Sequence, residues 1–194
     1  MRIGIDIDDT LTDIKEELEL AVLEYANKLG KQIKQDIMDL VDKNDGSIYQ
    51  VKYGFNDEEL KYFLKDIQES ITQKAVPRDY ANEAIRKLKN AGNEIYIITA
   101  RDCEFHDDPY MLSKEWLDRN KIQYDKLIVN ARDKAQICKN EKIDLFIDDK
   151  VSNCTDISKI GIKTIRIAND NNIYDSFITF KDWKSIYQYI NEME

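Results

Sequence analysis

Five short apolar runs, each ending abruptly in polar residues, recur along the chain. They are rich in β-branched residues and lie at 3–7, 95–99, 127–130, 145–148 and 164–167. Runs of this kind are typical of strands that are buried on both faces of a parallel sheet. Between the later runs, apolar spacing and helix-stop signals predict helices over 80–90, 111–120, 131–140 and 152–160. Strands that alternate with helices indicate βαβ crossovers, so we predict an α/β fold with a three-layer, doubly wound parallel sheet.

The first two runs are too far apart for a single crossover helix. The intervening sequence predicts a helix over 13–29, a helical piece over 34–41, a turn at 44–46 and a third helix that ends at Gln73. Asn56 and Glu59 have the spacing of a capping box at the start of that third helix. A connection of this size is typical of an inserted subdomain. We therefore predict a core domain of residues 1–12 and 77–194, with a small helical cap subdomain, residues 13–76, inserted after the first strand.

Composition narrows the class of protein. The 194 residues include 29 Lys and Arg against 38 Asp and Glu, a net charge of −9, which disfavours binding to a nucleic-acid polymer. No apolar run approaches the ~20 residues of a membrane helix. The chain also reaches Asp6 before a signal-peptide core could form. Its three cysteines form no C-x-x-C pair, which favours reduced thiols. We expect a soluble, cytoplasmic protein with no membrane partner, and the sequence leaves a homodimer open.

Polar side chains follow several of the predicted strands, and a lysine begins one of the helices. They are Asp6, Asp8, Thr99, Arg101, Lys134, Asp148 and Asp149. Ligands of open α/β sheets bind at the carboxyl ends of the strands, so we expect these side chains to lie together. Two acidic clusters at one edge repel each other unless a cation lies between them, and carboxylate oxygens favour Mg²⁺ over Zn²⁺. A lysine and a threonine at the same edge favour an anion such as phosphate.

Four segments resemble, in order, the motifs of the haloacid dehalogenase superfamily of phosphotransferases. Residues 6–12 (DIDDTLT) resemble motif I, D-x-D-x-T, and residues 97–101 (IITAR) are similar to motif II. Lys134 matches the lysine of motif III, and the pair at 148–149 matches the acidic motif IV. A narrower resemblance, to the 5'(3')-deoxyribonucleotidase family, lies in the sequences ARDK and FIDDK, the helical insert after motif I, and the closing DWK.

The resemblance implies a mechanism and a metal site. Asp6 would be the nucleophile that forms an aspartyl-phosphate, and Asp8 would be the general acid and base. Mg²⁺ would be bound by Asp6, the backbone carbonyl of Asp8 and Asp149. Asp148 would support the metal site without binding the ion directly, and it could exchange roles with Asp149.

The same resemblance implies the groups that bind the substrate phosphate. Thr99 and Lys134 would contact phosphoryl oxygens and count among the catalytic residues. The backbone amides of residues 7–10 are suited to a phosphate as well, and the wider phosphate set is Asp9, Thr10, Thr99, Ala100, Arg101 and Lys134. Asp9 stands where many superfamily members carry glycine, which adds a carboxylate beside the metal.

Several residues have a less specific interpretation. A calcium loop from Asp6 to Glu17 has Leu11 where such loops require glycine. Arg101 is as well explained by an ion pair with loop acids as by phosphate binding. His106, the one histidine, is expected in an exposed loop without a function. The aromatic residues of the insert are expected mostly to form its own small core rather than to stack on a base.

These observations predict a phosphoric monoester hydrolase of the nucleotidase kind. The expected reaction is Mg²⁺-dependent hydrolysis of a small phosphorylated metabolite. The leading hypothesis for this substrate is a nucleoside monophosphate. The alternatives are a phosphatase for a sugar phosphate or another metabolite, a phosphomutase, and a non-catalytic phosphate-binding module on the same fold. The sequence does not distinguish deoxyribose from ribose, or a 5' from a 3' phosphate.

Overall fold

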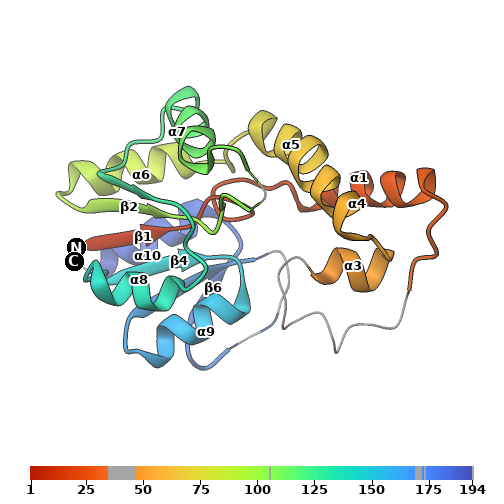
Figure 1. Cartoon of the computed structure of the whole chain (residues 1–194). Helices are drawn as coiled ribbons and strands as arrows, with labels where there is room; N and C mark the ends of the chain where they lie inside the picture. Colours follow the sequence, from red (N-terminus) through yellow and green to blue (C-terminus); the bar gives the residue numbers. More distant parts are fainter. Residues whose placement is uncertain (35–46, 105, 169–171, 173, 194) are drawn as a thin grey trace. The chain divides into compact units, whose positions relative to one another are not determined.

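The computed structural model of the chain describes residues 1–34, 47–104, 106–168, 172 and 174–193. It contains a six-stranded, all-parallel sheet in the order β3-β2-β1-β4-β5-β6. Figure 1 shows this sheet between two layers of helices. The strands are β1 (Arg2–Ile5), β2 (Glu94–Ile98), β3 (Lys126–Ile128), β4 (Leu145–Asp148), β5 (Lys163–Ile167) and β6 (Ile178–Phe180). The order reverses between β1 and β4, as in a doubly wound sheet. The predicted fold class and its five strands are confirmed, whereas β6 was not predicted.

Helices cover both faces of the sheet and complete the three layers. On one face, buried residues of α6 (Ala81–Asn90), α7 (Pro109–Arg119) and α10 (Trp183–Met193) pack against the isoleucines of the strands. On the other face lie α8 (Lys134–Asn140) and α9 (Val151–Lys159) (Figure 1). The four predicted helices of this region are α6 to α9, and α10 was not predicted.

Gly4 on the central strand β1 leaves room for the ring of Phe146, its partner on the neighbouring strand β4. Ile3 and Ile5 point to one face of the sheet, and Gly4 points to the opposite face, where Phe146 fills the space. A Cβ atom added at Gly4 would lie 2.6 Å from Cδ2 of Phe146, which is closer than real Cβ contacts. The glycine therefore lets the ring pack directly on β1, beside the strand ends that carry the candidate site.

The chain divides into two compact units, residues 1–13 with 75–194 and residues 14–74. The second unit is helical and contains α1 (Lys15–Lys28), α3 (Ser47–Tyr53), α4 (Asp57–Tyr62), the π-helical segment η1 (Phe63–Gln68) and α5 (Glu69–Lys74). The predicted capping box is confirmed, because Asn56 accepts from the Glu59 amide at 2.9 Å and the Glu59 side chain accepts from the Asn56 amide at 2.8 Å.

Other predictions for this unit have mixed outcomes. The predicted third helix is three consecutive segments, α4, η1 and α5, and α3 was not predicted. Residues 35–41 of the predicted second piece and the turn at 44–46 lie outside the described residues. Tyr53, Phe55 and Phe63 are buried in contact with one another or with Tyr25, which confirms that aromatic residues build this unit's own core. Within the described ranges, no helix has both the length and the apolar character needed to cross a bilayer.

Candidate active site

The loop after β1 is a tight turn that carries two of the predicted acids. The carbonyl of Ile7 accepts hydrogen bonds from the amides of Thr10, Leu11 and Thr12 at 3.3, 2.8 and 3.2 Å. Asp9 stands within this turn with φ of +56°, in the left-handed region that favours glycine and that aspartate tolerates. This backbone conformation explains why an aspartate can replace the glycine common at this position. The turn brings Asp6 and the side chain of Asp8 to the carboxyl edge of the sheet.

Lys134, the first residue of α8, connects the ends of β1 and β4. Its Nζ lies 2.8 Å from Oδ1 of Asp6 and 2.7 Å from Oδ2 of Asp148. The lysine side chain is only 4% exposed. Burial alone would lower the pKa of Lys134, but the two carboxylates raise it well above its usual value. Lys134 therefore stays a buried ammonium between two carboxylates.

The two acids at the end of β4 have different surroundings. Asp148 is fully buried and accepts from Nζ of Lys134, from Nδ2 of Asn153 and from the backbone amide of Lys150. Asp149 is half-buried, and its Oδ1 accepts from the hydroxyl of Thr10 at 3.2 Å. Both oxygens of Asp148 are thus occupied by protein donors. In the described part of the chain no protein donor meets Oδ2 of Asp149 or Oδ2 of Asp6.

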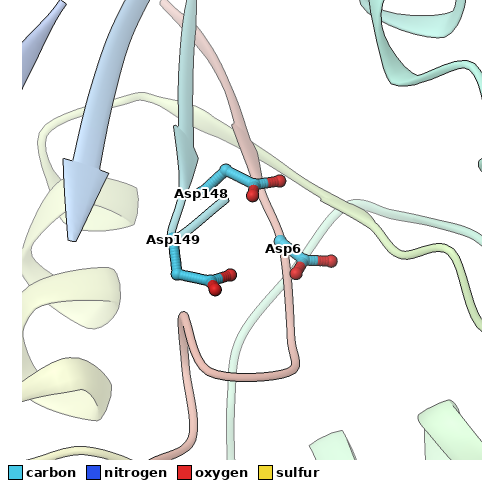
Figure 2. Close-up of side chains that lie close together, drawn as sticks. All are labelled: Asp6, Asp148 and Asp149. Atoms are coloured by element: carbon cyan, nitrogen blue, oxygen red, sulfur yellow. The ribbon is translucent and has the colours of Figure 1, made fainter. Parts of the chain in front are cut away.

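Asp6, Asp148 and Asp149 form a cluster of carboxylates at these neighbouring strand ends (Figure 2). Each offers an oxygen that lies within 4.8 Å of the others. Burial, together with the neighbouring acids, raises the pKa of Asp6 to about 7 and the pKa of Asp149 well above its usual range. Three carboxyl groups share one ammonium, so when all three are ionised the cluster has excess negative charge, which a bound cation would neutralise. Its all-oxygen donor set fits a hard divalent cation such as Mg²⁺.

Asp8 is paired with Arg101, which follows β2. Nε and Nη2 of the guanidinium lie 2.9 and 2.7 Å from the two carboxylate oxygens, and Nη1 lies 3.4 Å from the hydroxyl of Ser113. Burial by itself would raise the pKa of Asp8, but the charge and hydrogen bonds of Arg101 hold that pKa below its usual value. Arg101 thus forms an ion pair, as one of its two interpretations expects, and its contact with phosphate stays a prediction.

The structure also gives the contacts of the remaining residues that were predicted to bind phosphate. Thr99 is buried at the end of β2, and its hydroxyl accepts from the Arg101 amide at 3.4 Å. Ala100 is exposed. The Asp9 carbonyl accepts hydrogen bonds from Arg78. The structure thus brings together five of the predicted residues, namely Asp6, Thr10, Lys134, Asp148 and Asp149. Two others, Asp8 and Thr99, form hydrogen bonds with Arg101. Among the described residues, no hydrogen bond links Thr99 or Ala100 to the carboxylate cluster.

The predicted exposure of His106 is wrong, and the structure does not favour the calcium loop. His106 was expected to be exposed, but it is only 8% exposed. Its amide donates to the Asp102 carbonyl at 3.1 Å, so this part of the segment is turned back on itself by a local hydrogen bond. Glu17, the twelfth position of the hypothetical calcium loop, is an exposed residue in the first turn of α1, and the loop follows a strand rather than a helix.

Three residues of this region were missed from the sequence. Arg78 binds the loop after β1, Asn153 binds Asp148, and Ser113 lies against Arg101. Asn153 stands in the first turn of α9, five residues after Asp148, and this polar position was the only local signal. Nothing in the local sequence around Arg78 or Ser113 indicates the contacts that they make.

Comparison with solved structures identifies the fold. The chain superposes on the "putative beta-phosphoglucomutase" of Thermotoga maritima with a TM-score of 0.69 at 14% identity, over 100% of this chain and 99% of the other. It superposes on a haloacid dehalogenase-like family hydrolase of Streptococcus pneumoniae with a TM-score of 0.67 at 14% identity, over 97% of each chain. The fold is therefore that of the haloacid dehalogenase superfamily, and the resemblance seen in the motifs is confirmed at the level of fold.

Sequence comparison points to a narrower group. No protein-family model matches the chain. It is 28% identical, over 98% of its length and 94% of the relative's, to a Bacillus subtilis protein named "Putative nucleotidase". It is 25% identical, over 100% of its length and 95% of the relative's, to a Clostridium acetobutylicum protein named "Nucleotidase". The chain is thus similar along its whole length to bacterial proteins named as nucleotidases.

Proposed function

We propose that this chain is a Mg²⁺-dependent phosphomonoesterase that hydrolyses a nucleoside monophosphate, as a 5'(3')-deoxyribonucleotidase does. The observation that carries the proposal is the buried Lys134, which binds Asp6 and Asp148 at once, with Asp149 beside them. A constellation of this kind combines a nucleophile with a site for a cation and a charge that can bind phosphate. The similarity to proteins named as nucleotidases supports the substrate class.

Asp6, Asp149 and the backbone carbonyl of Asp8 are the groups proposed to bind the ion. Asp6 and Asp149 each keep one oxygen without a protein donor in the described structure, whereas both oxygens of Asp148 are occupied. Asp148 is accordingly assigned to positioning Lys134. The ion, when bound, would neutralise negative charge shared by the nucleophile and the phosphate. A magnesium-bound haloacid dehalogenase-like hydrolase of Bacillus subtilis has the same fold, with a TM-score of 0.64 at 13% identity over 98% of each chain.

The proposed reaction has two displacements at phosphorus. A carboxylate oxygen of Asp6 forms a bond to phosphorus while the bond to the leaving oxygen breaks. Asp8, whose pKa is lowered by Arg101, first takes up a proton from the monoanionic phosphate of the substrate and then gives it to the leaving oxygen. Asp8 then takes a proton from water as the water oxygen attacks phosphorus and the bond to Asp6 breaks. Once that proton leaves with the phosphate, Asp6 and Asp8 are restored, and the products are an alcohol and inorganic phosphate.

The phosphate would be bound by groups with N–H or O–H donors directed to this edge. Lys134 has three N–H donors and uses two of them on carboxylates, which leaves one for a phosphoryl oxygen. Thr99, Arg101 and the backbone amides of residues 7 and 8 complete the proposed set, because the amides of Asp9 and Thr10 already donate within the turn to the Thr12 hydroxyl and the Ile7 carbonyl. The helical insert, residues 13–76, is proposed to act as the cap that selects the leaving group.

The test is phosphate release from a panel of deoxyribonucleoside and ribonucleoside monophosphates, with sugar phosphates alongside. Each compound is assayed with Mg²⁺ and with EDTA, for the wild type, Asp6→Asn and Asp149→Asn. Lys139→Met, an exposed change on the same helix as Lys134, is the matched control. We expect release that favours nucleotides, requires Mg²⁺, is abolished in both aspartate variants and is unchanged in the control.

The other outcomes separate the alternatives. Release from sugar phosphates alone would replace the substrate class, an alternative that the β-phosphoglucomutase neighbour keeps open. No release from any compound, together with thermal stabilisation of the wild type by phosphate and Mg²⁺, would indicate a binding module and refute catalysis.

A further inference from the structure

Arg78 binds the backbone of the loop after β1 from a position 69 residues farther along the chain. Its Nη2 donates to the Asp9 carbonyl at 2.9 Å, and its Nε donates to the Thr12 carbonyl at 2.8 Å and to the Asp9 carbonyl at 3.3 Å. Nη1 lies 3.2 Å from Oδ2 of Asp13, and the Arg78 side chain is only 11% exposed. A guanidinium has five N–H donors in a rigid fork, so it can bind two carbonyls of one turn at fixed separation.

The carbonyl that receives two of these bonds belongs to a strained residue. Asp9 has φ of +56°, in the left-handed region that favours glycine, so contacts with its carbonyl help to hold this conformation. Asp9 also follows Asp8 directly, so the orientation of the Asp8–Asp9 peptide depends on that conformation. The contacts of Arg78 therefore stabilise the backbone on which the proposed acid and base of the reaction is carried.

The same contacts connect the two chain segments at the boundary of the insert. Residues 12 and 77 form an antiparallel bridge, and the Arg78 amide donates to the Leu11 carbonyl at 2.7 Å. All of these atoms lie in the unit formed by residues 1–13 and 75–194. The segment that returns from the insert is thus bonded directly to the turn that bears Asp8.

We propose that Arg78 is a positioning residue for the proposed phosphatase reaction, acting by holding Asp9 in its left-handed conformation. The inference rests on the proposed function for its effect on turnover. Its effect on the turn does not require that function. If Arg78 served only to form an ion pair with Asp13, replacing it would change neither the Asp9 turn nor the turnover of substrate.

The experiment is a double-mutant cycle between positions 78 and 9. Arg78→Ala removes the guanidinium group. Asp9→Gly lets residue 9 adopt a positive φ without the steric cost of a side chain. Arg78→Lys keeps the charge but not the fork, and it replaces Arg78→Ala in the cycle if that variant does not fold. Asp13→Asn is the matched control, because it removes only the half-exposed ion pair. Each variant is measured for kcat, KM and urea unfolding.

We expect Arg78→Ala to lower kcat about tenfold or more while KM changes less, since a misplaced catalytic group acts mainly on the transition state. Asp9→Gly in that background should recover kcat at least about threefold relative to Arg78→Ala, and the single Asp9→Gly variant completes the cycle. Arg78→Lys should fall between Arg78→Ala and the wild type, and Asp13→Asn should stay within about twofold of the wild type.

Two results would overturn the proposal: a kcat for Arg78→Ala within about twofold of the wild type, or losses from positions 78 and 9 that simply add. If the wild type hydrolyses no substrate, the proposed function fails, and the unfolding cycle alone decides the inference. A smaller loss of stability from Arg78→Ala in the Asp9→Gly background would then support the assigned contact, and an equal loss would refute it.

Discussion

The guanidinium of Arg101 binds both carboxylate oxygens of Asp8, at 2.9 and 2.7 Å, and the two residues are 93 positions apart. The arginine side chain is 3% exposed, whereas that of Asp8 is 37% exposed. The charge on Arg101 is therefore buried behind a carboxylate whose other side faces solvent. This arrangement fixes the carboxylate and leaves it accessible, and the lowered pKa of Asp8 suits the general-base step of the proposed reaction.

Asp8→Asn should lower the free energy of unfolding at neutral pH, because Arg101 would stay buried without its counter-charge. Breaking a fully buried ion pair costs about 3–5 kcal/mol, and the exposure of Asp8 reduces the expected loss to about 2 kcal/mol. Urea unfolding measures the difference. Asp118→Asn, which removes an exposed ion pair with Lys114, is the control and should change little.

The same variant gives a pH test with a defined sign. The pKa of Asp8 is lower in the folded protein than in the unfolded chain, so the pair stabilises the fold above the unfolded pKa of about 3.9. That contribution is lost as pH falls through the folded pKa. The gap between wild type and Asp8→Asn should therefore close below about pH 4. A gap that stays constant down to acid pH would contradict this assignment.

Removal of divalent metal should make stability depend on pH through Asp6. Burial raises the pKa of Asp6 to about 7 against an ordinary value of 3.8, so the folded state binds more protons than the unfolded state between these values. In EDTA, the contribution of Asp6 to stability should fall as pH rises toward 7 and then level off.

Mg²⁺ should consequently raise the melting temperature more at about pH 8 than at about pH 5.5, where protons compete with the ion for the carboxylates. Thermal unfolding with and without saturating Mg²⁺ measures both effects. Asp6→Asn, which lacks the titrating group, should lose most of the difference. Equal stabilisation of the wild type at the two pH values would argue against a metal site at these carboxylates.

Lys134→Met should be strongly destabilising, because it leaves Asp6 and Asp148 buried with no ammonium between them. We expect a loss of about 3–5 kcal/mol in metal-free urea unfolding. Adding Asp148→Asn should restore part of that loss by removing one of the uncompensated charges. Lys139→Met on the exposed side of the same helix is the control. If Lys134→Met were as stable as this control, the buried ion cluster would not contribute as described.

Gly4→Ala should destabilise the core unit by about 1–3 kcal/mol, since its Cβ would lie 2.6 Å from the Phe146 ring and 3.3 Å from Cγ2 of Ile143. Phe146→Leu removes the ring, so the double variant should be more stable than the sum of the single changes predicts. Urea unfolding of the four proteins measures this coupling. Strictly additive losses would show that the ring moves away without cost.

The five strongest strands and the capping box could be predicted because their signals are local. β1, β2 and β4 are buried on both faces and read as continuous apolar runs. β6 has three residues, none of them buried, at the edge of the sheet, so it has no such pattern. α10 was missed although Trp183, Ile186 and Ile190 have helical spacing and are buried. The helical spacing of these three apolar residues is by itself enough to predict the helix.

The sequence by itself determined which polar residues end the strands, and hence that Asp6, Asp148 and Asp149 meet at one edge of the sheet. That follows from topology, because the carboxyl ends of parallel strands lie together. Only the tertiary structure decided which partner each charge has, since a contact such as that of Arg101 with Asp8 depends on packing between distant segments. It likewise distinguished the donor-occupied Asp148 from Asp149 and placed Arg78 on the Asp9 turn. Sequence patterns encode local periodicity, whereas these pairings depend on the distances and burial that the complete fold imposes.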